Sequence, residues 1–557
     1  MIQRPAGRAL TVLDPNDLPM PRVAPRRPEM PADERLAEFR PEDQALPRFH
    51  IWTLGCQMNR SDSEEMAGRL LAAGLAESPR VETADLVVIN TCAIREQAEQ
   101  KVIGRQGHLQ QLKRANPGLR VVLTGCSVRE AERSGLARRF PAVDLFLRPD
   151  EEPELVDRLG LASAQAAIAG GSSGTTGVLG RTPVGVADAL PGTRAQAVAD
   201  GRVHRGSATS AWLPIIYGCD KSCTYCIVPF SRGPERSRPF DDVVAEARRL
   251  AEQGYREVTL LGQNVNSYGH DLLGEARFAH IATERWGGRK IDLRARPDLA
   301  ELLRAIDGLR TADGLPAISR LRFVTSHPWD LSDRLIAAMA RCPSVCEHLH
   351  LPIQSGDDAV LHRMGRQYTV EHYLERLARI REAIPGIAIS TDVIVGFCGE
   401  TEAQFEATLR LLECVRYDQV FAAAFSPRPG TPATRLVDDV PPAEKRRRLN
   451  VLLALQERIS VERNRAWEGR DTQVLLDTIV PPRSHEHGDE GAGQGTEPAN
   501  EPATGVGLHV PDGLVHLSGR SRENKLVHVA GPTELVGRLV RVRVEHGGPY
   551  SLRGALA

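Results

Sequence analysis

Apolar runs alternate with amphipathic stretches from about residue 48 onward. Runs at 49–53, 86–90 and 121–125 predict three β-strands. Residues 61–71, between the first two runs, predict a helix that begins at Ser61 or Asp62. Because strands alternate with helices, the pattern favours a parallel sheet.

A second α/β series extends from about residue 211 to residue 466. Strands are predicted at 258–261, 321–324, 348–351 and 388–394, and amphipathic helices at 243–253 and 371–383. About six strand–helix units of this kind would form a partial (β/α) barrel, with its chemistry at the carboxyl ends of the strands. Residues 271–297 read as an inserted loop.

The remaining segments complete an α/β chain with a small β-barrel at its end. Alternating residues at 473–479 and 538–545 predict that barrel, and a Gly/Glu/Pro-rich loop at 483–507 interrupts it. We therefore expect a disordered extension (1–46), an N-terminal parallel-sheet domain (47–160), a Gly/Ser-rich linker (161–206), a central partial barrel (207–464) and a C-terminal domain (465–557).

Charge, apolar runs and cysteine count limit where the protein is expected to act and what it is expected to contact. The formal net charge is −1 over 557 residues, so any attraction to nucleic acid must be local. No run of about 18 apolar residues occurs, and the N-terminus lacks the apolar core of a signal peptide. The 10 cysteines are too few for a disulfide framework in so long a chain. We expect a reduced, cytoplasmic location without membrane contact.

The most informative cysteines are Cys219, Cys223 and Cys226, at C-x3-C-x2-C spacing. Three thiolates on one tight loop can hold three irons of a [4Fe–4S] cluster and leave the fourth iron open. A zinc site is the alternative, but zinc fingers pair two such knuckles and no fourth ligand lies nearby. A redox C-x2-C pair would leave Cys219 unexplained.

A more dispersed trio consists of Cys56, Cys92 and Cys126, each of which follows a predicted strand and a small or turn residue. In a parallel sheet these strand ends share one edge, where three thiolates can converge as a second open cluster. Three unrelated buried cysteines are the alternative. Ordinary packing explains the cysteines that fit neither pattern: Cys342, Cys346, Cys398 and Cys414.

With these two trios the chain resembles the methylthiotransferases of the radical S-adenosylmethionine (SAM) superfamily, in the branch that acts on N6-isopentenyl (dimethylallyl) adenosine of tRNA. The resemblance covers about residues 48–557, outside the linker and inserted loops. Its motifs are GCQMN (55–59), NTCAIRE (90–96), RGPERSR (232–238), LGQNVNSY (261–268), TSHP (325–328) and SPRPGTP (426–432).

The resemblance implies two [4Fe–4S] clusters and SAM as cofactors. The cluster at Cys219, Cys223 and Cys226 would bind SAM and generate a 5′-deoxyadenosyl radical. The cluster at Cys56, Cys92 and Cys126 would hold the sulfur, which a second SAM methylates before it joins C2 of the adenine. No side chain is expected to act as catalytic acid or base, because the cofactors carry the chemistry.

The resemblance also implies SAM contacts at three turns that follow predicted strands. They comprise Gly262, Gln263 and Asn264, then Gln354 and Ser355, and then Gly396 and Glu400. Gln263 and Asn264 replace the family's usual Gly and Glu, so an amide or a backbone carbonyl would have to serve. Cys398 stands where the family has proline, and we expect only a change of turn. Plain βα turns are the alternative for all three.

Basic residues suggest anion contacts. Arg232, Arg236 and Arg238 could bind the SAM carboxylate or tRNA phosphate. The C-terminal domain resembles the TRAM module, and from residue 519 onward seven Lys or Arg stand against three Glu, an excess of four positive charges. We expect RNA contacts there at Arg520, Arg522 and Lys525. The run 444–448 is basic as well, but a solvated helix face explains it.

The expected substrate is the adenosine at position 37 in the anticodon stem-loop of tRNA. An external electron donor and a sulfur source are expected partners, and the enzyme is expected to be a monomer. The same chemistry on threonylcarbamoyladenosine or on a ribosomal-protein aspartate is the nearest alternative. A non-catalytic iron–sulfur RNA-binding protein is the alternative from another class.

Overall fold

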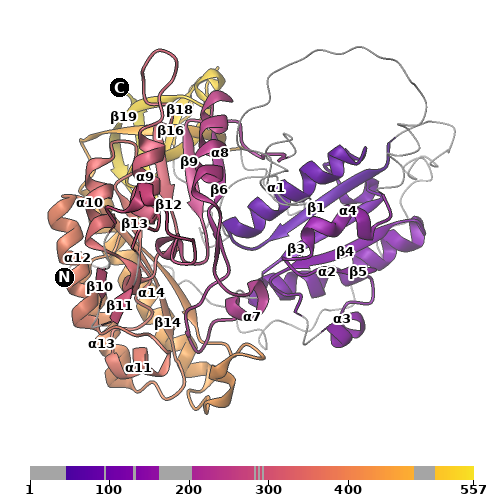
Figure 1. Cartoon of the computed structure of the whole chain (residues 1–557), viewed down its shortest axis with the longest axis horizontal. Helices are drawn as coiled ribbons and strands as arrows, with labels where there is room; N and C mark the ends of the chain where they lie inside the picture. The colour runs from indigo at the N-terminus through magenta and orange to yellow at the C-terminus, as the bar shows by residue number, and fades with distance from the viewer. Residues whose placement is uncertain are drawn as a thin grey trace, which may run out of the picture.

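The computed structural model describes residues 46–92, 96–129, 133–161, 203–281, 284–286, 289–291, 294–481 and 508–557. Nearly all of the predicted extension (1–46), most of the predicted linker (161–206) and the predicted loop 483–507 lie outside them. At the end of the linker, the His204 N–H donates to Glu64 O and the Arg205 guanidinium pairs with Glu246, so these residues are anchored. Figure 1 shows an N-terminal lobe in indigo beside a central partial barrel, with a small barrel in yellow at the C-terminus.

The N-terminal lobe (residues 46–161) contains the predicted parallel sheet, in the strand order β2-β1-β3-β4-β5. Alternate residues of β3 enter different cores, with Val87 and Ile89 on one face and Leu86 and Val88 on the other. A sheet buried on both faces explains the continuous apolar runs of the sequence. The strands are β1 (Arg48–Leu54), β2 (Ala76–Glu77), β3 (Leu86–Thr91), β4 (Arg120–Gly125) and β5 (Leu145–Phe146). The helices are α1 (Gln57–Ala72), α2 (Glu96–Ala115), α3 (Arg133–Arg139) and α4 (Leu155–Arg158).

The first helix begins four residues earlier than the sequence pattern indicates. α1 starts at Gln57 with Cys56 as its N-cap residue, and the Asn59 side chain accepts from the Cys56 N–H. Ser61 and Asp62, predicted as the opening residues, are instead buried inside the helix. The prediction was wrong because a cysteine and an asparagine form the capping box that Ser or Thr and Glu usually form.

The central partial barrel contains six parallel strands, which confirms the predicted architecture. They form two sheets, β6-β9-β12 and β13-β14-β15, joined by a parallel bridge between Leu321 and Val345. The strands are β6 (Ser210–Pro214), β9 (Glu257–Leu261), β12 (Arg320–Phe323), β13 (His348–His350), β14 (Ala388–Val395) and β15 (Gln419–Ala424). The helices described in this domain are α7 (Val228–Arg232), α8 (Phe240–Glu252), α9 (Leu299–Asp307), α10 (Asp333–Arg341), α11 (Asp358–Arg363), α12 (Val370–Ala383), α13 (Glu402–Val415) and α14 (Pro442–Arg465).

The predicted insertion at 271–297 contains regular structure where it is described. A 3₁₀ turn (Ala276–Phe278) precedes an antiparallel pair of short strands, β10 (Glu284–Trp286) and β11 (Arg289–Ile291). Phe278 packs edge-on against Phe240 of α8, with ring centroids 5.1 Å apart, so the 3₁₀ turn lies against this helix.

The C-terminal barrel is closed by five strands in the order β16-β17-β18-β20-β19. Its interior is aliphatic, with Val474, Leu517, Val527 and Val542 fully buried. No helix in the described part of the chain is long and apolar enough to cross a membrane. The strands are β16 (Asp471–Ile479), β17 (Val515–Ser521), β18 (Leu526–Gly531), β19 (Leu539–Gly547) and β20 (Leu552–Leu556).

Candidate functional site

The dispersed cysteines meet at one edge of the N-terminal sheet. Leu54, Thr91 and Gly125, the last residues of β1, β3 and β4, are aligned in register. Each strand is followed closely by a cysteine: Cys56, Cys92 and Cys126. The parallel sheet thus brings together three residues that are more than thirty positions apart, as the pattern of strand ends predicts.

The backbone at this edge has no room for side chains. A Cβ on Gly125 would lie 2.2 Å from Thr91 O, and the φ of Gly125 is +91°. A Cβ on Gly55 would lie 2.4 Å from Asn59 Oδ1 and 3.0 Å from the Cβ of Cys92. Glycine is therefore required before Cys56 and before Cys126 so that the chain can approach this closely.

The three thiols interact with one another. A hydrogen bond with Cys92 is the largest influence on Cys56, and with Arg232 nearby it lowers the pKa of Cys56 to about 6. Burial raises the pKa of Cys126, and the Cys56 charge raises it further. One thiolate is therefore already favoured at neutral pH, and thiolates are the form that binds metal.

The second trio lies on the loop between β7 (Ile216–Tyr217) and α7 (Val228–Arg232). The loop is closed by the pairing of β7 with β8 (Arg236–Ser237) and by the Cys219 N–H, which donates to Gly233 O. Cys219 and Cys223 are buried, and Cys226 is half-buried. Burial raises the pKa of both Cys219 and Cys226 to about 12, so bound cations would have to stabilise these thiolates.

The two trios are neighbours across the junction between the N-terminal lobe and the partial barrel. Arg232, six residues after Cys226, donates to Cys126 Sγ of the N-terminal lobe. Burial is the main cause of the raised pKa of Cys226, and the charge of Cys126 adds a small contribution. The helix that follows Cys226, α7, lies between the two parts of the molecule in Figure 1. Two chemical sites from different domains therefore face each other.

Each trio has a buried arginine on one of its sulfurs. Arg232 Nε donates to Cys126 Sγ at 3.1 Å, and Arg366 Nη1 donates to Cys223 Sγ at 3.3 Å. Arg366 is also fixed by Tyr368 Oη at 2.8 Å and by Pro352 O at 2.9 Å. The sequence analysis missed Arg366. A signal exists in Gly365, whose φ of +72° lets the chain pass close to Ser222 in the cysteine loop.

A loop after β15 touches both sites. Arg129, three residues after Cys126, donates to Pro429 O, and the Ala433 N–H donates to Thr224 O at 2.8 Å. Thr224 lies between Cys223 and Cys226. The SPRPGTP motif at 426–432 is therefore part of the junction between the two sites.

Only one of the three predicted SAM turns presents a buried polar atom without a partner. That atom is Oε1 of Gln263. The neighbouring Asn264 is engaged within the protein, since its Nδ2 donates to Asp330 Oδ2 at 2.7 Å and its Oδ1 accepts from the His327 N–H. Gly262 is required sterically, because a Cβ there would lie 2.3 Å from Ile216 Cγ2. Gln263 is thus the residue of this turn that fits a polar ligand.

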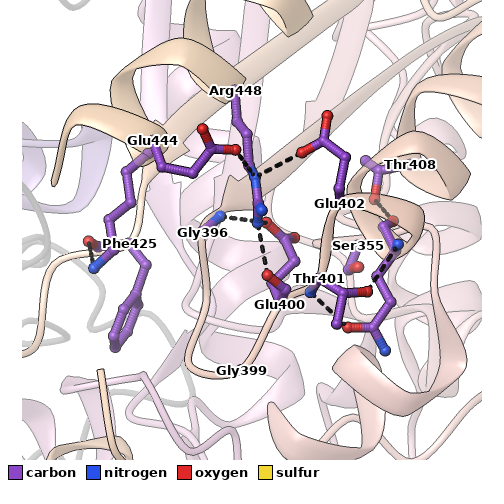
Figure 2. Close-up of polar contacts among 12 residues, drawn as sticks. Ser355, Gly396, Gly399, Glu400, Thr401, Glu402, Thr408, Phe425, Glu444 and Arg448 are labelled. Carbon is purple, nitrogen blue, oxygen red and sulfur yellow. Dashed lines mark hydrogen bonds and ion pairs between the residues drawn. The ribbon is translucent and has the colours of Figure 1, made fainter. Parts of the chain in front are cut away.

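The turn at Gly396 has a supporting role in the structure. Glu400 Oε2 accepts from the Gly396 N–H at 2.6 Å and from Arg448 Nη1 at 2.8 Å (Figure 2). A Cβ on Gly396 would lie 2.4 Å from Cγ of Lys445. α14 thus packs on the Cα of this glycine, and the SAM contact expected at this turn stays a prediction.

The other predicted SAM turn lies just before α11. Gln354 is buried with a φ of +73° and bridges to Val393, and Ser355 Oγ accepts from the Asp357 N–H at 3.3 Å.

The four cysteines outside the two trios lie elsewhere in the partial barrel. Cys342 packs in the large core and Cys346 is buried, Cys398 packs with Phe397 and Phe425, and Cys414 is exposed.

Two of the three basic residues expected to bind RNA, Arg522 and Lys525, instead join the C-terminal barrel to the partial barrel. Arg522 pairs with both carboxylate oxygens of Glu347 at 2.7 and 2.8 Å, and Lys525 Nζ lies 2.8 Å from Asp418 Oδ1. The carbonyl of Arg520 accepts from Arg320. The expectation differs from the structure because a local excess of positive charge does not reveal that Glu347 and Asp418 of the same chain pair with Arg522 and Lys525. Of the trio after the cysteine loop, Arg238 similarly pairs with Glu246 at 2.7 Å.

The donor set fits iron–sulfur clusters. All ten cysteines are free of disulfides. Within the residues that the structure describes, no three His, Cys, Asp or Glu side chains converge as ligands of a single metal ion. A cluster makes no such demand, because each cysteine binds a different iron.

Two family models match the chain. The model described as the radical SAM superfamily matches residues 213–412, and the model described as uncharacterized protein family UPF0004 matches residues 48–148. Among solved structures, the radical SAM methyltransferase TsrM from Kitasatospora setae, with cobalamin and a [4Fe–4S] cluster bound, is 17% identical with a TM-score of 0.47. It covers 70% of this chain and 77% of that chain.

Curated relatives match over nearly the full length. The tRNA-2-methylthio-N(6)-dimethylallyladenosine synthase of Roseiflexus sp. (strain RS-1) is 38% identical over 95% of this chain and 93% of the relative. The protein of the same name from Carboxydothermus hydrogenoformans is 39% identical over 91% and 99%, respectively. The chain therefore belongs to the family of tRNA-2-methylthio-N(6)-dimethylallyladenosine synthases.

Proposed function

We propose that this protein is a tRNA methylthiotransferase that adds a methylthio group to C2 of N6-isopentenyl (dimethylallyl) adenosine. The observation that carries the proposal is the pair of three-cysteine sites that face each other across one domain junction. The names of its relatives supply the substrate class. A reaction that joins sulfur to an unactivated carbon needs one site for the radical and another for the sulfur.

In this proposal Cys219, Cys223 and Cys226 hold a [4Fe–4S] cluster that binds SAM, and Cys56, Cys92 and Cys126 hold a second cluster. Together these cofactors supply the radical, the sulfur and the methyl group. The chain keeps the site dry by burial, orients Cys126 and Cys223 through Arg232 and Arg366, and offers Gln263 Oε1 to a polar group of SAM. No side chain needs to move a proton.

The substrate proposed is adenosine 37 in the anticodon stem-loop, acted on by a monomer with an external electron donor and sulfur source. RNA contacts at the C-terminal barrel are assigned to its outer surface, since Arg522 and Lys525 are engaged by the partial barrel. Arg538 and Arg541 are exposed there, and such side chains hold phosphates while unstacked bases are read elsewhere.

Mass spectrometry of tRNA nucleosides tests the function. A strain that lacks this gene should lose 2-methylthio-N6-isopentenyladenosine and accumulate the isopentenyl nucleoside, and the wild-type gene should restore the methylthio group. Loss of a methylthio group from threonylcarbamoyladenosine, or from a ribosomal-protein aspartate, would contradict the assigned substrate. Unchanged nucleosides and proteins would contradict the enzyme assignment altogether.

A further inference from the structure

Arg232 belongs to the partial barrel but contacts the cysteine site of the N-terminal lobe. It is the last residue of α7, six positions after Cys226, and its side chain is 4% exposed. Most buried arginines of the partial barrel pair with carboxylates of the same domain, as Arg238 does with Glu246. Arg232 instead contacts Cys126 and Asp62, which both belong to the N-terminal lobe.

The contacts of Arg232 are short and directional. Nε donates to Cys126 Sγ at 3.1 Å, and Nη2 donates to Asp62 Oδ2 at 2.6 Å. The Asp62 side chain is 9% exposed, so the ion pair is screened from water. The fork of the guanidinium fixes both partners at once, which a lysine ammonium would not do. One side chain thus fixes a thiol of the sheet relative to the helix that follows Cys226.

We propose that Arg232 is a positioning residue that sets the reduction potential of the cluster at Cys56, Cys92 and Cys126 and holds that cluster against the radical site. The inference rests on the proposed function, because it assumes a cluster there. Hydrogen bonds to ligand sulfurs and nearby positive charge stabilise the reduced, more negative form of an iron–sulfur cluster. Removal of Arg232 therefore lowers the potential of this cluster.

Arg366, the second arginine that contacts a cysteine sulfur, differs from Arg232 in the domain of its partners. Arg366 makes the equivalent contact with Cys223, but its other partners, Tyr368 and Pro352, belong to the same domain as the cysteine. Arg366 therefore supports one site from within. Arg232 connects two sites, so its loss affects the N-terminal cluster and the junction together.

The test uses the full-length protein with Cys219, Cys223 and Cys226 replaced by Ala, reconstituted with iron and sulfide. Its remaining cluster is titrated with a reductant and followed by EPR. Arg232→Gln in this background should lower the reduced-to-oxidised ratio at a fixed potential at least tenfold, which is about 59 mV for a one-electron couple. Arg238→Gln removes an equally buried arginine that touches no cysteine, and it should leave the midpoint unchanged.

A second variant tests the direction of the shift in midpoint potential. Asp62→Asn removes the negative partner and leaves Arg232 on Cys126, so the midpoint should move toward more positive potentials. A structural loosening would not give opposite shifts for the two variants. Shifts of the same sign, or no shift in Arg232→Gln, would overturn the role of Arg232.

The outcome also separates this inference from the proposed function. If the parent protein with three alanines binds no iron, the second cluster and the role of Arg232 both fail. If it binds iron and Arg232→Gln leaves its midpoint unchanged, only the role of Arg232 fails. Hydrogen exchange of the cluster-free full chain gives an independent readout, because Arg232→Gln should expose α7 amides and Arg238→Gln should not.

Discussion

At the carboxyl ends of its strands the partial barrel meets the N-terminal lobe through Arg232, which donates to a cysteine sulfur. At the amino ends it meets the C-terminal barrel through Arg320 and Arg322, which donate to the backbone carbonyls of Arg520 and Ser521 at 2.6 Å each. Both junctions depend on buried arginines, but the acceptors differ. Carbonyls are complete acceptors, whereas burial raises the pKa of the Cys126 thiol, which therefore stays protonated until a cation stabilises the thiolate.

The residues that stabilise the fold and the residues that carry the chemistry thus lie at opposite ends of the strands of the partial barrel. Glu257, Glu347 and Asp418 lie at or just before the amino ends of β9, β13 and β15, and each has a cationic partner. The carboxyl ends carry the cysteine loop, Gln263 and the loop at 426–432. This division agrees with the general placement of active sites in barrels of this type. Substitutions at the two ends should therefore fail in different ways.

The largest effect is expected from Cys226→Ala. The variant should form no 5′-deoxyadenosine above background when it is reduced in the presence of SAM, because a cluster site with two cysteines would not hold the iron that binds SAM. Liquid chromatography of the reaction measures the product. Cys414→Ala removes an exposed cysteine outside both sites and should retain wild-type cleavage. Cleavage by Cys226→Ala at the wild-type rate would contradict the assignment of this trio.

Cys92→Ala should separate SAM cleavage from methylthiolation of the tRNA. Formation of 5′-deoxyadenosine should remain within about threefold of wild type, a change of less than 1 kcal/mol in the barrier, while methylthiolated tRNA disappears. Iron content should fall by about half. Nucleoside mass spectrometry and the SAM cleavage assay measure both on one sample. Methylthiolated product from this variant would refute the division of labour between the two trios.

The cysteine sites could be predicted because one is marked by spacing within a single loop and the other by the ends of predicted strands. The spacing of Cys219, Cys223 and Cys226 is local, and the strand ends before Cys56, Cys92 and Cys126 are readable from apolar runs. A parallel sheet then requires the dispersed cysteines to converge. The same periodicity located four of the six strands of the partial barrel, at 258–261, 321–324, 348–351 and 388–394, but it did not locate β6 or β15.

The residues that connect the domains could not be predicted in the same way. Arg522 and Lys525 have the composition of an RNA-binding surface, and only the fold shows that Glu347 and Asp418 lie opposite them. The same holds for Arg366 inside the partial barrel, which lies 143 positions from Cys223 without any periodicity that relates the two. Long-range pairing of single polar side chains depends on tertiary placement, which the sequence pattern does not encode.

Arg522→Ala should weaken the amino-end junction without stopping the radical chemistry. It removes two charge-assisted bonds to Glu347 and the bonds to Pro343 O and Val345 O, at a cost of about 2 kcal/mol. Hydrogen exchange in β17 and β18 should rise by about 30-fold, while SAM cleavage stays at the wild-type level. Arg541→Ala, on the exposed side of β19, should change neither. Loss of SAM cleavage in Arg522→Ala would contradict the separation of the two ends.

The smallest effect is expected from acid, and it should appear at the amino-end junction. Burial alone would raise the pKa of Asp418, but Lys525 and Arg463 lower it below its ordinary value. A carboxyl with a lowered folded-state pKa stabilises the fold above its unfolded pKa, about 3.9, and loses that contribution as the pH falls through the folded value.

Hydrogen exchange in β17 and β18 should therefore increase below about pH 4, after correction for intrinsic exchange. Asp418→Asn should flatten that dependence, because the group that takes up the proton is gone. Asp471→Asn removes an exposed partner of Arg543 on the outer side of the barrel and should leave the dependence intact. If Asp418→Asn kept the full acid response, another group would carry that response, and the assignment of the acid sensitivity of the amino-end junction to the Asp418–Lys525 pair would be wrong.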